Sequence, residues 1–206
     1  MSGLLFVVSA ASGTGKTSLV KALLERVSNL HVSVSHTTRD QRTGELDGVH
    51  YHFTSKELFL SQVNQGGFIE FAEVFGNYYG TAQTTVKDQL AQGHDVLLEI
   101  DWQGAEQVRK LFPESKQVFI LPPTQFDLRQ RLSNRGTDSV EVIERRLSSA
   151  VEDMQQFVNF DFIIINDDFN KALHDLESII NANRLTLAQQ ANRHETMIQN
   201  LITPQS

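Results

Sequence analysis

A glycine-bearing segment near the start of the chain has the residue types that hold phosphate. It follows an apolar run over 4–8 and leads directly into a helical pattern over 16–27. This order of strand, loop and helix is what a P-loop requires. The backbone N–H groups of its small residues would converge on phosphate oxygens, with Lys16 reaching the β- and γ-phosphates and Thr17 offering its hydroxyl to Mg²⁺. The predicted triphosphate-binding residues are Ala10, Ala11, Ser12, Gly13, Thr14, Gly15, Lys16 and Thr17.

Ala10 stands where the P-loop pattern has its first glycine. Alanine is comfortable at that position only if its φ angle is negative, because a side chain disfavours the left-handed region. A glycine turn that caps a helix without any ligand is the alternative. The Gly-Lys-Thr triplet directly after a strand argues against it. The segment by itself indicates only that a nucleoside triphosphate binds.

Arginine and tyrosine side chains gather in the segment that follows. Arg39 and Arg42 lie three residues apart, Tyr51 follows them, and Tyr79 stands in a second cluster over 76–81. Guanidinium groups and phenol hydroxyls donate hydrogen bonds to phosphate without a competing acceptor charge. Such a cluster alone is more often a solvated surface or a salt-bridge network. A P-loop in the same chain favours a second phosphate-binding site.

Two acidic residues end the apolar strand pattern over 96–100. Glu99 and Asp101 are two residues apart, so they point to the same face of a strand. An apolar strand that delivers an acid to a P-loop is typical of magnesium sites, and we expect Thr17 and Asp101 to serve the ion, through water, with the part of Glu99 left open. Alternatively, Asp101 caps the helix that follows.

The elements that must position these residues alternate between strand and helix. Continuous apolar runs over 4–8, 96–100, 118–121 and 162–165, with a weaker one over 31–35, predict parallel strands that are covered on both faces. Helical patterns over 16–27 and 105–112, and from Asn170 onward, complete an α/β open sheet. The segment from Leu185 onward is expected to form a surface helix that frays near Pro204.

Two stretches interrupt this alternation. Residues 35–80 carry short strands around a helix, for which Thr54 and Glu57 predict a capping box, and we expect them to form an inserted lobe. Residues 124–147 carry two helical patterns joined by an arginine-bearing turn, which suits a mobile lid. The rest of the core would consist of 1–34, 81–123 and 148–206, within a single domain over 1–206.

Composition narrows the class of protein. The chain has 206 residues, no cysteine and a net charge of −7. Without cysteine, disulfides and thiolate metal sites are excluded, and the cytoplasm is the expected location. The acidic balance argues against nucleic-acid and membrane partners, and the apolar run over 4–8 is too short for a signal segment.

The sequence resembles guanylate kinases over nearly its whole length. The resemblance rests on six segments: 9–17, 35–42, 76–81, 99–104, 135–136 and 165–168. It implies a P-loop nucleoside monophosphate kinase-like core of parallel strands, with an inserted GMP-binding lobe and a helical lid. It also implies transfer of the γ-phosphoryl group of ATP to GMP with the help of Mg²⁺.

Carried over residue by residue, the resemblance assigns further roles. The implied GMP-binding residues are Ser35, Arg39, Arg42, Tyr51, Glu70, Tyr79, Thr81 and Asp101. The implied catalytic residues are Lys16, Arg39, Arg131, Arg135 and Arg146. Arg145 and Arg146 point about 100° apart on a helix, and the resemblance selects Arg146 for the cleft. An ionised Glu70 would accept from the adjacent N–H groups of guanine, a pair that adenine lacks.

Two other functions remain open at this point. A non-catalytic guanylate-kinase-like module would use the lobe to hold a peptide, but it would have no need of Lys16 and Thr17. A kinase of another nucleoside monophosphate is disfavoured by Glu70 and Thr81. The sequence leaves open whether the chain is a monomer or a homo-oligomer.

Overall fold

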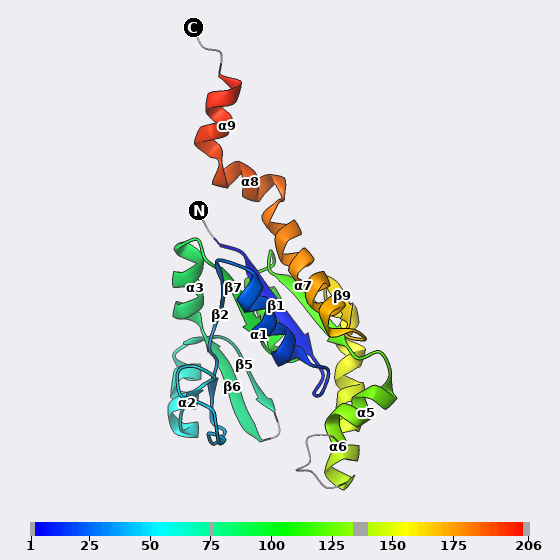
Figure 1. Cartoon of the computed structure of the whole chain (residues 1–206). Helices are drawn as coiled ribbons and strands as arrows, with labels where there is room; N and C mark the ends of the chain where they lie inside the picture. Colours follow the sequence, from blue (N-terminus) through cyan, green and yellow to red (C-terminus); the bar gives the residue numbers. More distant parts are fainter. Residues whose placement is uncertain (1–2, 75, 134–139, 204–206) are drawn as a thin grey trace.

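A five-stranded parallel sheet forms the centre of the molecule (Figure 1). The computed structural model describes residues 3–74, 76–133 and 140–203. The strand order is β2-β7-β1-β8-β9. The strands are β1 (Leu5–Ala10), β2 (Leu30–Val32), β7 (Asp95–Glu99), β8 (Lys116–Leu121) and β9 (Phe162–Ile165). Each neighbouring pair is parallel, as the continuous apolar runs predicted.

Helices cover both faces of this sheet. On one face lie α1 (Lys16–Arg26) and α7 (Phe169–Arg184), which pack against Phe6 and Val8 of β1. On the other face α3 (Gln83–Ala91) and α4 (Trp102–Leu111) pack against Leu5 and Val7. Because neighbouring residues of β1 point to opposite faces and both faces are buried, the strand is apolar without alternation.

A second sheet, of four strands, stands below the first in Figure 1. Its order is β4-β3-β6-β5, and α2 (Lys56–Asn64) packs on it. The strands are β3 (His36–Thr37), β4 (His52–Phe53), β5 (Phe68–Val74) and β6 (Asn77–Ala82). The predicted cap at Thr54 is one residue early, because Ser55 accepts the hydrogen bond from the Leu58 N–H and α2 begins after it.

A pair of helices packs against the P-loop. It consists of α5 (Gln125–Ser133) and α6 (Val140–Met154), which continues into the short 3₁₀ helix η1 (Gln155–Asn159). Leu128, Leu132 and Ala150 of this pair pack together with Ala11 of the P-loop. The pair therefore has a small apolar core of its own that includes one residue of the P-loop.

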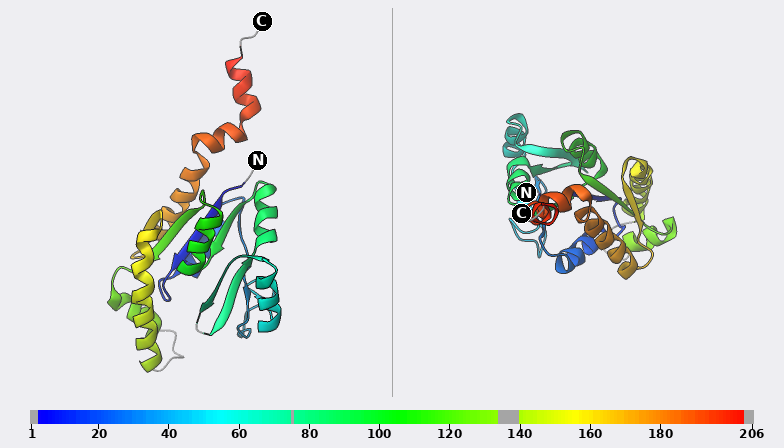
Figure 2. Two further views of the ribbon diagram at one scale, coloured as in Figure 1. Left: turned by 180° about the vertical axis from the view of Figure 1, so that it is seen from behind. Right: turned by 90° about the horizontal axis from the view of Figure 1, so that it is seen from above.

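The carboxyl-terminal segment does not pack on the sheet as a single helix. After α7 the chain forms α8 (Leu187–Arg193) and α9 (Glu195–Ile202), and neither has a buried residue. Figure 2 shows the two helices extending away from the body on the side where the amino terminus lies. Among the described residues, no helix has the length and apolar character needed to cross a membrane.

A nearly buried carboxylate ties the two ends of the core together. Asp95 accepts hydrogen bonds from the Leu4 N–H at 2.7 Å and from Nε of Arg184 at 2.7 Å. Its side chain is only 9% exposed. We expect Asp95→Asn to lower the free energy of unfolding by about 2 kcal/mol, because Arg184 keeps its charge and loses its ionised partner.

Urea unfolding measures this loss, and Asp88→Asn on the exposed side of α3 is the matched control. The control should change the free energy of unfolding by less than about 0.5 kcal/mol. Equal, small losses in both variants would show that the tie does not stabilise the fold.

Candidate functional site

The P-loop lies at the carboxyl edge of the parallel sheet, between β1 and α1. Gly13 and Gly15 have φ angles of 89° and 96°, at which a residue with a side chain would be strained. Ala10 is the last residue of β1 and is not among the described residues with positive φ, so it meets the condition set by the sequence. The loop therefore has the backbone of a phosphate cradle, with alanine at its first position.

The side chains of the loop point to the end of β7. Nζ of Lys16 donates to the Ile100 carbonyl at 3.0 Å, and the Thr17 hydroxyl donates to the Glu99 carboxylate. Asp101 instead caps α4, accepting from the Gly104 N–H at 2.8 Å. The structure thus brings Glu99, and not the favoured Asp101, to the hydroxyl that was expected to face Mg²⁺.

Oxygen ligands at this edge fit a magnesium ion. Mg²⁺ in phosphate-transfer sites is held by one or two protein oxygens together with substrate phosphates and water, rather than by a full protein cage. Thr17 and Glu99 offer a hydroxyl and a carboxylate in direct contact beside the cradle. No group of three or more His, Cys, Asp or Glu side chains suited to a metal occurs in the described part of the chain.

Arginines of the helical pair reach the same loop. Arg131 donates to the carbonyls of Thr14 at 3.2 Å and Asn166 at 2.8 Å, and Arg146 donates to the Ser12 hydroxyl at 2.9 Å. Arg145 is exposed, so its neighbour Arg146 is the one that faces the P-loop. Arg135 lies outside the described residues.

Asn166 is a residue of this site to which the sequence analysis gave no role. It follows β9, is 5% exposed, and its amide donates to the Thr14 carbonyl at 2.7 Å. A side chain on Gly15 would lie 2.6 Å from that amide. A polar residue directly after a core strand was the available signal, since parallel strands end at one edge of a sheet.

The carboxylate of Glu70 is buried, so this residue is not a solvent-facing member of its strand. Strand β5 pairs Phe68 with Ala82 and Glu70 with Thr81, so the register shifts at Ile69. This bulge turns both Ile69 and Glu70 inward, where strict alternation would bury only one of them. Gly104 of α4 makes room for the carboxylate, since a Cβ there would lie 2.5 Å from Glu70 Oε2.

Hydroxyl groups surround the buried carboxylate. Thr81 donates to Glu70 Oε1 at 2.6 Å, and the hydroxyls of Thr81 and Ser35 are 3.2 Å apart. Burial raises the pKa of Glu70 from its ordinary value of 4.5 to about 7, and the negative charge of Asp101 adds to this rise. The hydrogen bond from Thr81 and the positive charge of Lys16 act in the opposite direction. The charge of Lys16 in the P-loop is therefore near enough to Glu70 to act on the pKa of its carboxyl.

The arginine cluster includes an acceptor that the sequence analysis did not anticipate. Nη2 of Arg39 donates to both carboxylate oxygens of Glu45, at 2.7 and 3.0 Å, and the Arg42 N–H donates to the same carboxylate at 2.8 Å. The hydrogen bond from Arg39 holds the pKa of Glu45 below its usual value. The four donor side chains carry no acceptor charge themselves, but Glu45 brings one beside them, and Arg39 takes part in a salt bridge.

Two tyrosines stand beside this cluster. The ring centroids of Tyr51 and Tyr79 are 5.9 Å apart, and the Arg39 guanidinium lies 5.5 Å from the Tyr51 centroid. Burial raises the pKa of Tyr51, and the charge of Glu99 adds to the rise, so its hydroxyl remains a donor at neutral pH. Arg42 has an exposed side chain. Arg39, Tyr51 and Tyr79 thus lie side by side and offer donors to an anion.

Comparisons with known proteins point to one family, both from sequence and from structure. The family model described as guanylate kinase matches residues 2–183. A guanylate kinase of Acinetobacter baylyi is 83% identical over all of both chains, and one of Psychrobacter arcticus is 57% identical over 98% of each. The crystal structure of guanylate kinase from Anaplasma phagocytophilum superposes with a TM-score of 0.80 at 30% identity, covering 98% of this chain and 97% of that one.

The raised pKa of Glu70 makes stability depend on pH. The folded pKa of about 7 exceeds the ordinary value of 4.5. The protonated carboxyl therefore stabilises the fold fully below about pH 4.5, and this contribution is lost as pH rises through 7. Relative to Glu70→Gln, the wild-type chain should lose on the order of 3 kcal/mol of unfolding free energy across that window.

Urea unfolding at several pH values measures the difference between the two proteins. Glu73→Gln, at an exposed position of the same strand, is the control and should follow the wild-type pH dependence. A wild-type chain whose stability tracks that of Glu70→Gln at every pH would show that Glu70 does not take up a proton in the folded state.

Proposed function

The chain belongs to the guanylate kinase family, and we propose from this premise how its residues divide the transfer of a phosphoryl group from ATP to GMP. It is a nucleoside monophosphate kinase, an ATP:GMP phosphotransferase. The observation that carries the proposed division is the buried Glu70 carboxylate, which accepts from Thr81 and lies against Gly104 of α4 in the core. It supports an acceptor pocket and a donor cradle that open on the same edge of the sheet.

The P-loop binds the triphosphate of ATP in this proposal. Residues 10–17 surround the phosphates with backbone N–H groups, and Lys16 exchanges its contact with the Ile100 carbonyl for the β- and γ-phosphates. Thr17 and Glu99 hold Mg²⁺, with Asp101 acting mainly as the cap of α4. Bound Mg²⁺ neutralises phosphate charge and orients the triphosphate.

The lobe binds both the phosphate and the base of GMP. Arg39, Arg42, Tyr51 and Tyr79 donate to the phosphate, and Glu45 keeps the Arg39 guanidinium in place before GMP arrives. Ser35, Glu70 and Thr81 surround the guanine base, with Asp101 nearby. Guanine presents adjacent N–H donors to Glu70, so its binding favours the ionised carboxylate, whereas adenine would leave a buried acceptor unpaired.

Arginines of the helical pair stabilise the charge that spreads over the moving phosphoryl group. Arg131 and Arg146 already contact the P-loop, and we propose that Arg135, which lies between the two helices in the sequence, joins them. The proposed parts are a core, a GMP-binding lobe over 35–80 and a lid over 124–147. Closure of lobe and lid around both nucleotides would exclude water, which otherwise would accept the phosphoryl group.

Neither alternative function is favoured. A peptide-binding module without catalysis has no use for the P-loop contacts of Lys16, Arg131 and Arg146. The buried Glu70 argues against a kinase of adenine nucleotides. The proposed partners are ATP and GMP, with no nucleic acid or membrane, and the cytoplasm is the proposed location because both nucleotides are used there.

The choice of acceptor tests the pocket. With ATP and Mg²⁺, the wild-type enzyme should phosphorylate GMP far better than AMP. Glu70→Gln should lower kcat/KM for GMP on the order of a hundredfold, because a neutral amide cannot accept from both guanine N–H groups, and should change the small AMP rate much less. A coupled assay of ADP formation measures both rates. Lys16→Ala is the control that must lose turnover with either acceptor, and wild-type activity equal for GMP and AMP would refute the pocket.

Paired acid variants test the metal assignment. Glu99→Gln should raise the Mg²⁺ concentration needed for half-maximal activity about tenfold, because Thr17 loses its charged neighbour. Asp101→Ala should shift that concentration little and instead lower the free energy of unfolding by about 1 kcal/mol, because α4 loses its cap. Magnesium titrations and urea unfolding of both variants measure the two effects. If the Asp101 variant shifted the Mg²⁺ requirement and the Glu99 variant did not, Asp101 would be the residue that serves the ion.

A further inference from the structure

Trp102 is a residue of the segment 99–104 to which the proposed function gives no part. It is the only tryptophan of the chain and the first residue of α4, directly after the cap residue Asp101. Its indole N–H donates to Oδ1 of Asp153, in the last turn of α6, at 3.0 Å. Both partners of this hydrogen bond are partly buried. The bond therefore joins a helix of the core to the helix that carries Arg146.

Asp153 and Arg146 lie on nearly the same side of α6. They are seven residues apart, which in an α-helix is about two turns, or roughly 10 Å along the axis. Arg146 donates to the Ser12 hydroxyl of the P-loop at 2.9 Å, whereas Asp153 accepts from α4. Because these two contacts are made at separate points along one helix, they fix its direction as well as its position.

A cavity lies between α4 and the 3₁₀ helix η1 that continues α6. It has a volume of about 320 Å³, and Trp102 and Phe160 are part of its lining. Farther along α4, Arg109 also lines the cavity and donates to the Asn159 carbonyl at 3.0 Å, beyond the end of α6. The hydrogen bond to Asp153 reaches α6 itself. At this incompletely filled boundary a directed hydrogen bond, rather than close packing, sets the angle between α4 and α6.

The carboxylate of Asp153 serves this contact as an acceptor and not through its charge. Burial raises the pKa of Asp153, the hydrogen bond from Trp102 opposes this rise, and the negative charge of Asp101 adds to it. A negative charge is thus unfavourable at this position. An amide oxygen in the same place would accept the same hydrogen bond without the charge.

We propose that Asp153 is a positioning residue for phosphoryl transfer, because its hydrogen bond with Trp102 directs α6 and so places the Arg146 guanidinium at the P-loop. The proposal rests on the role of Arg146 in the proposed function. Groups that stabilise the charge of a moving phosphoryl group must be in place before the reaction, and a small displacement of such a group lowers the rate strongly. Asp153 acts only through Arg146 and does not itself bind a nucleotide.

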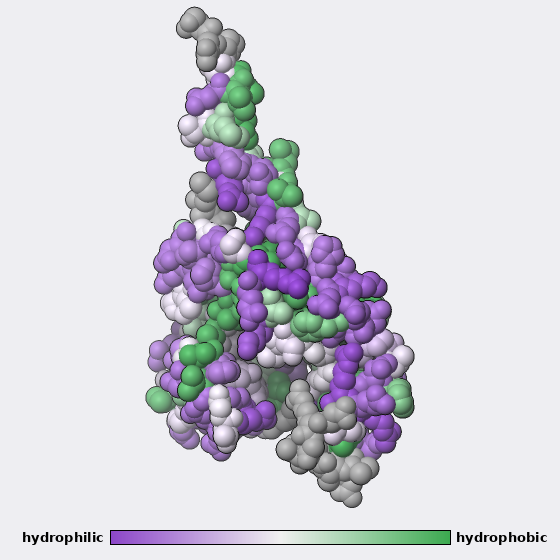
Figure 3. Space-filling model, in the orientation of Figure 1, coloured by the Kyte–Doolittle hydropathy of each residue, from purple (hydrophilic) through white to green (hydrophobic). Residues whose placement is uncertain are grey.

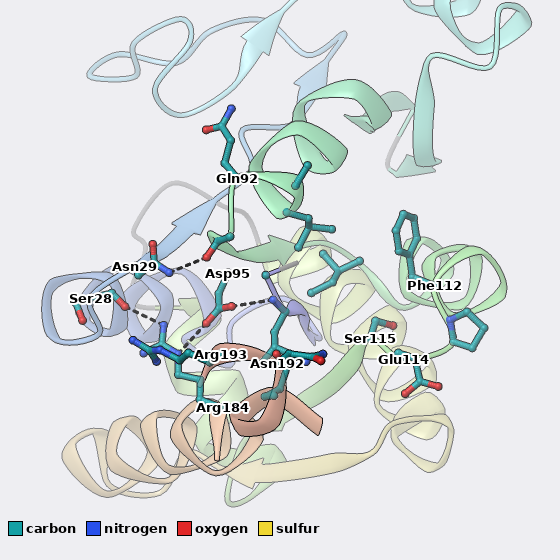
Figure 4. A pocket seen from close by; sticks show the side chains of 18 of the residues that line it. Ser28, Asn29, Gln92, Asp95, Phe112, Glu114, Ser115, Arg184, Asn192 and Arg193 are labelled. Carbon is teal, nitrogen blue, oxygen red and sulfur yellow. Dashed lines mark hydrogen bonds and ion pairs between the residues drawn. The ribbon is translucent and has the colours of Figure 1, made fainter. Parts of the chain in front are cut away.

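Two other conspicuous features of the surface lie at the opposite end of the core. In Figure 3 apolar surface runs along one side of α9. Figure 4 shows a hollow of about 890 Å³ at the amino edge of the parallel sheet, where Asp95 and Arg184 lie. Trp102 instead follows the carboxyl end of β7. Variants of Trp102 and Asp153 therefore leave the amino edge of the sheet unchanged.

Steady-state kinetics with ATP, GMP and Mg²⁺ test the proposal. Asp153→Ala should lower kcat about tenfold and leave KM for GMP within about twofold, because the proposed GMP-binding residues do not belong to α6. Asp153→Asn keeps an acceptor oxygen and should hold kcat within about twofold of the wild-type value. Glu152→Ala removes the same charge from the adjacent exposed position and is the matched control, with kcat unchanged. Circular dichroism shows whether each variant is folded.

Double variants test whether Asp153 acts through Arg146. Arg146→Ala should lower kcat about a hundredfold. Adding Asp153→Ala to it should cause little further loss, because the guanidinium that Asp153 places is gone. If Arg146→Ala keeps wild-type kcat, the proposed role of Arg146 fails and this inference fails with it. If Arg146→Ala loses activity and Asp153→Ala does not, the inference alone is wrong.

Tryptophan fluorescence tests the hydrogen bond in solution. Because Trp102 is the only tryptophan, the emission reports its surroundings alone. Asp153→Ala should shift the emission to longer wavelength, since water then reaches the indole N–H, and Glu152→Ala should not. An unshifted emission in Asp153→Ala, a tenfold loss of kcat in Asp153→Asn or in Glu152→Ala, or losses that add fully when Asp153→Ala is combined with Arg146→Ala would each overturn the proposal.

Discussion

The junction around Glu70 is the contact on which the whole site depends. Glu70 belongs to the lobe, yet its carboxylate lies against Gly104 of α4 in the core and accepts from Thr81. The Gln107 side chain of α4 holds the same strand by accepting from the Phe71 N–H and donating to the Phe71 carbonyl. One strand of the lobe is thus fixed to one helix of the core at the position of Glu70. Burial there raises the pKa of the carboxyl to about 7, and the proposed contact with guanine N–H groups would favour its ionised form.

In both proposed phosphate sites the donors are held by acceptors of the protein itself. Lys16 and Thr17 contact oxygens of β7, Arg131 and Arg146 contact the P-loop, and Arg39 contacts Glu45, so every one of these donors is already directed by a protein acceptor. Preorganised donors lose little freedom when a phosphate replaces those acceptors. The acidic net charge of −7 is therefore compatible with two polyanionic substrates, because positive groups gather locally at the P-loop and beside Glu45.

Local patterns predicted the parts of the site that local geometry determines. The P-loop and the parallel strands follow from spacing along a few residues, and four of the five strands have bounds within two residues of those expected. The weaker run over 31–35 is a shorter strand, β2, which ends at Val32. The burial of Glu70 was less accessible, since it depends on a bulge at Ile69 and on a glycine 34 positions away in the sequence, at 104. The Glu45 contact and the choice of Glu99 over Asp101 beside Thr17 depend on side-chain directions that spacing does not fix. The carboxyl-terminal segment forms two helices, α8 and α9, neither of which has a buried residue. This depends on tertiary contacts that a local pattern does not show.

Competition by a single molecule that joins adenosine and guanosine through five phosphates tests the central claim most directly. If the cradle around Lys16 and the lobe around Arg39 open on one shared cleft, calorimetry should find one such molecule per chain, bound more tightly than either ADP or GMP, and saturating it should displace both nucleotides together. If the linked molecule displaces only one of the two, or two molecules bind per chain, then the donor and acceptor sites do not face each other and the account is wrong.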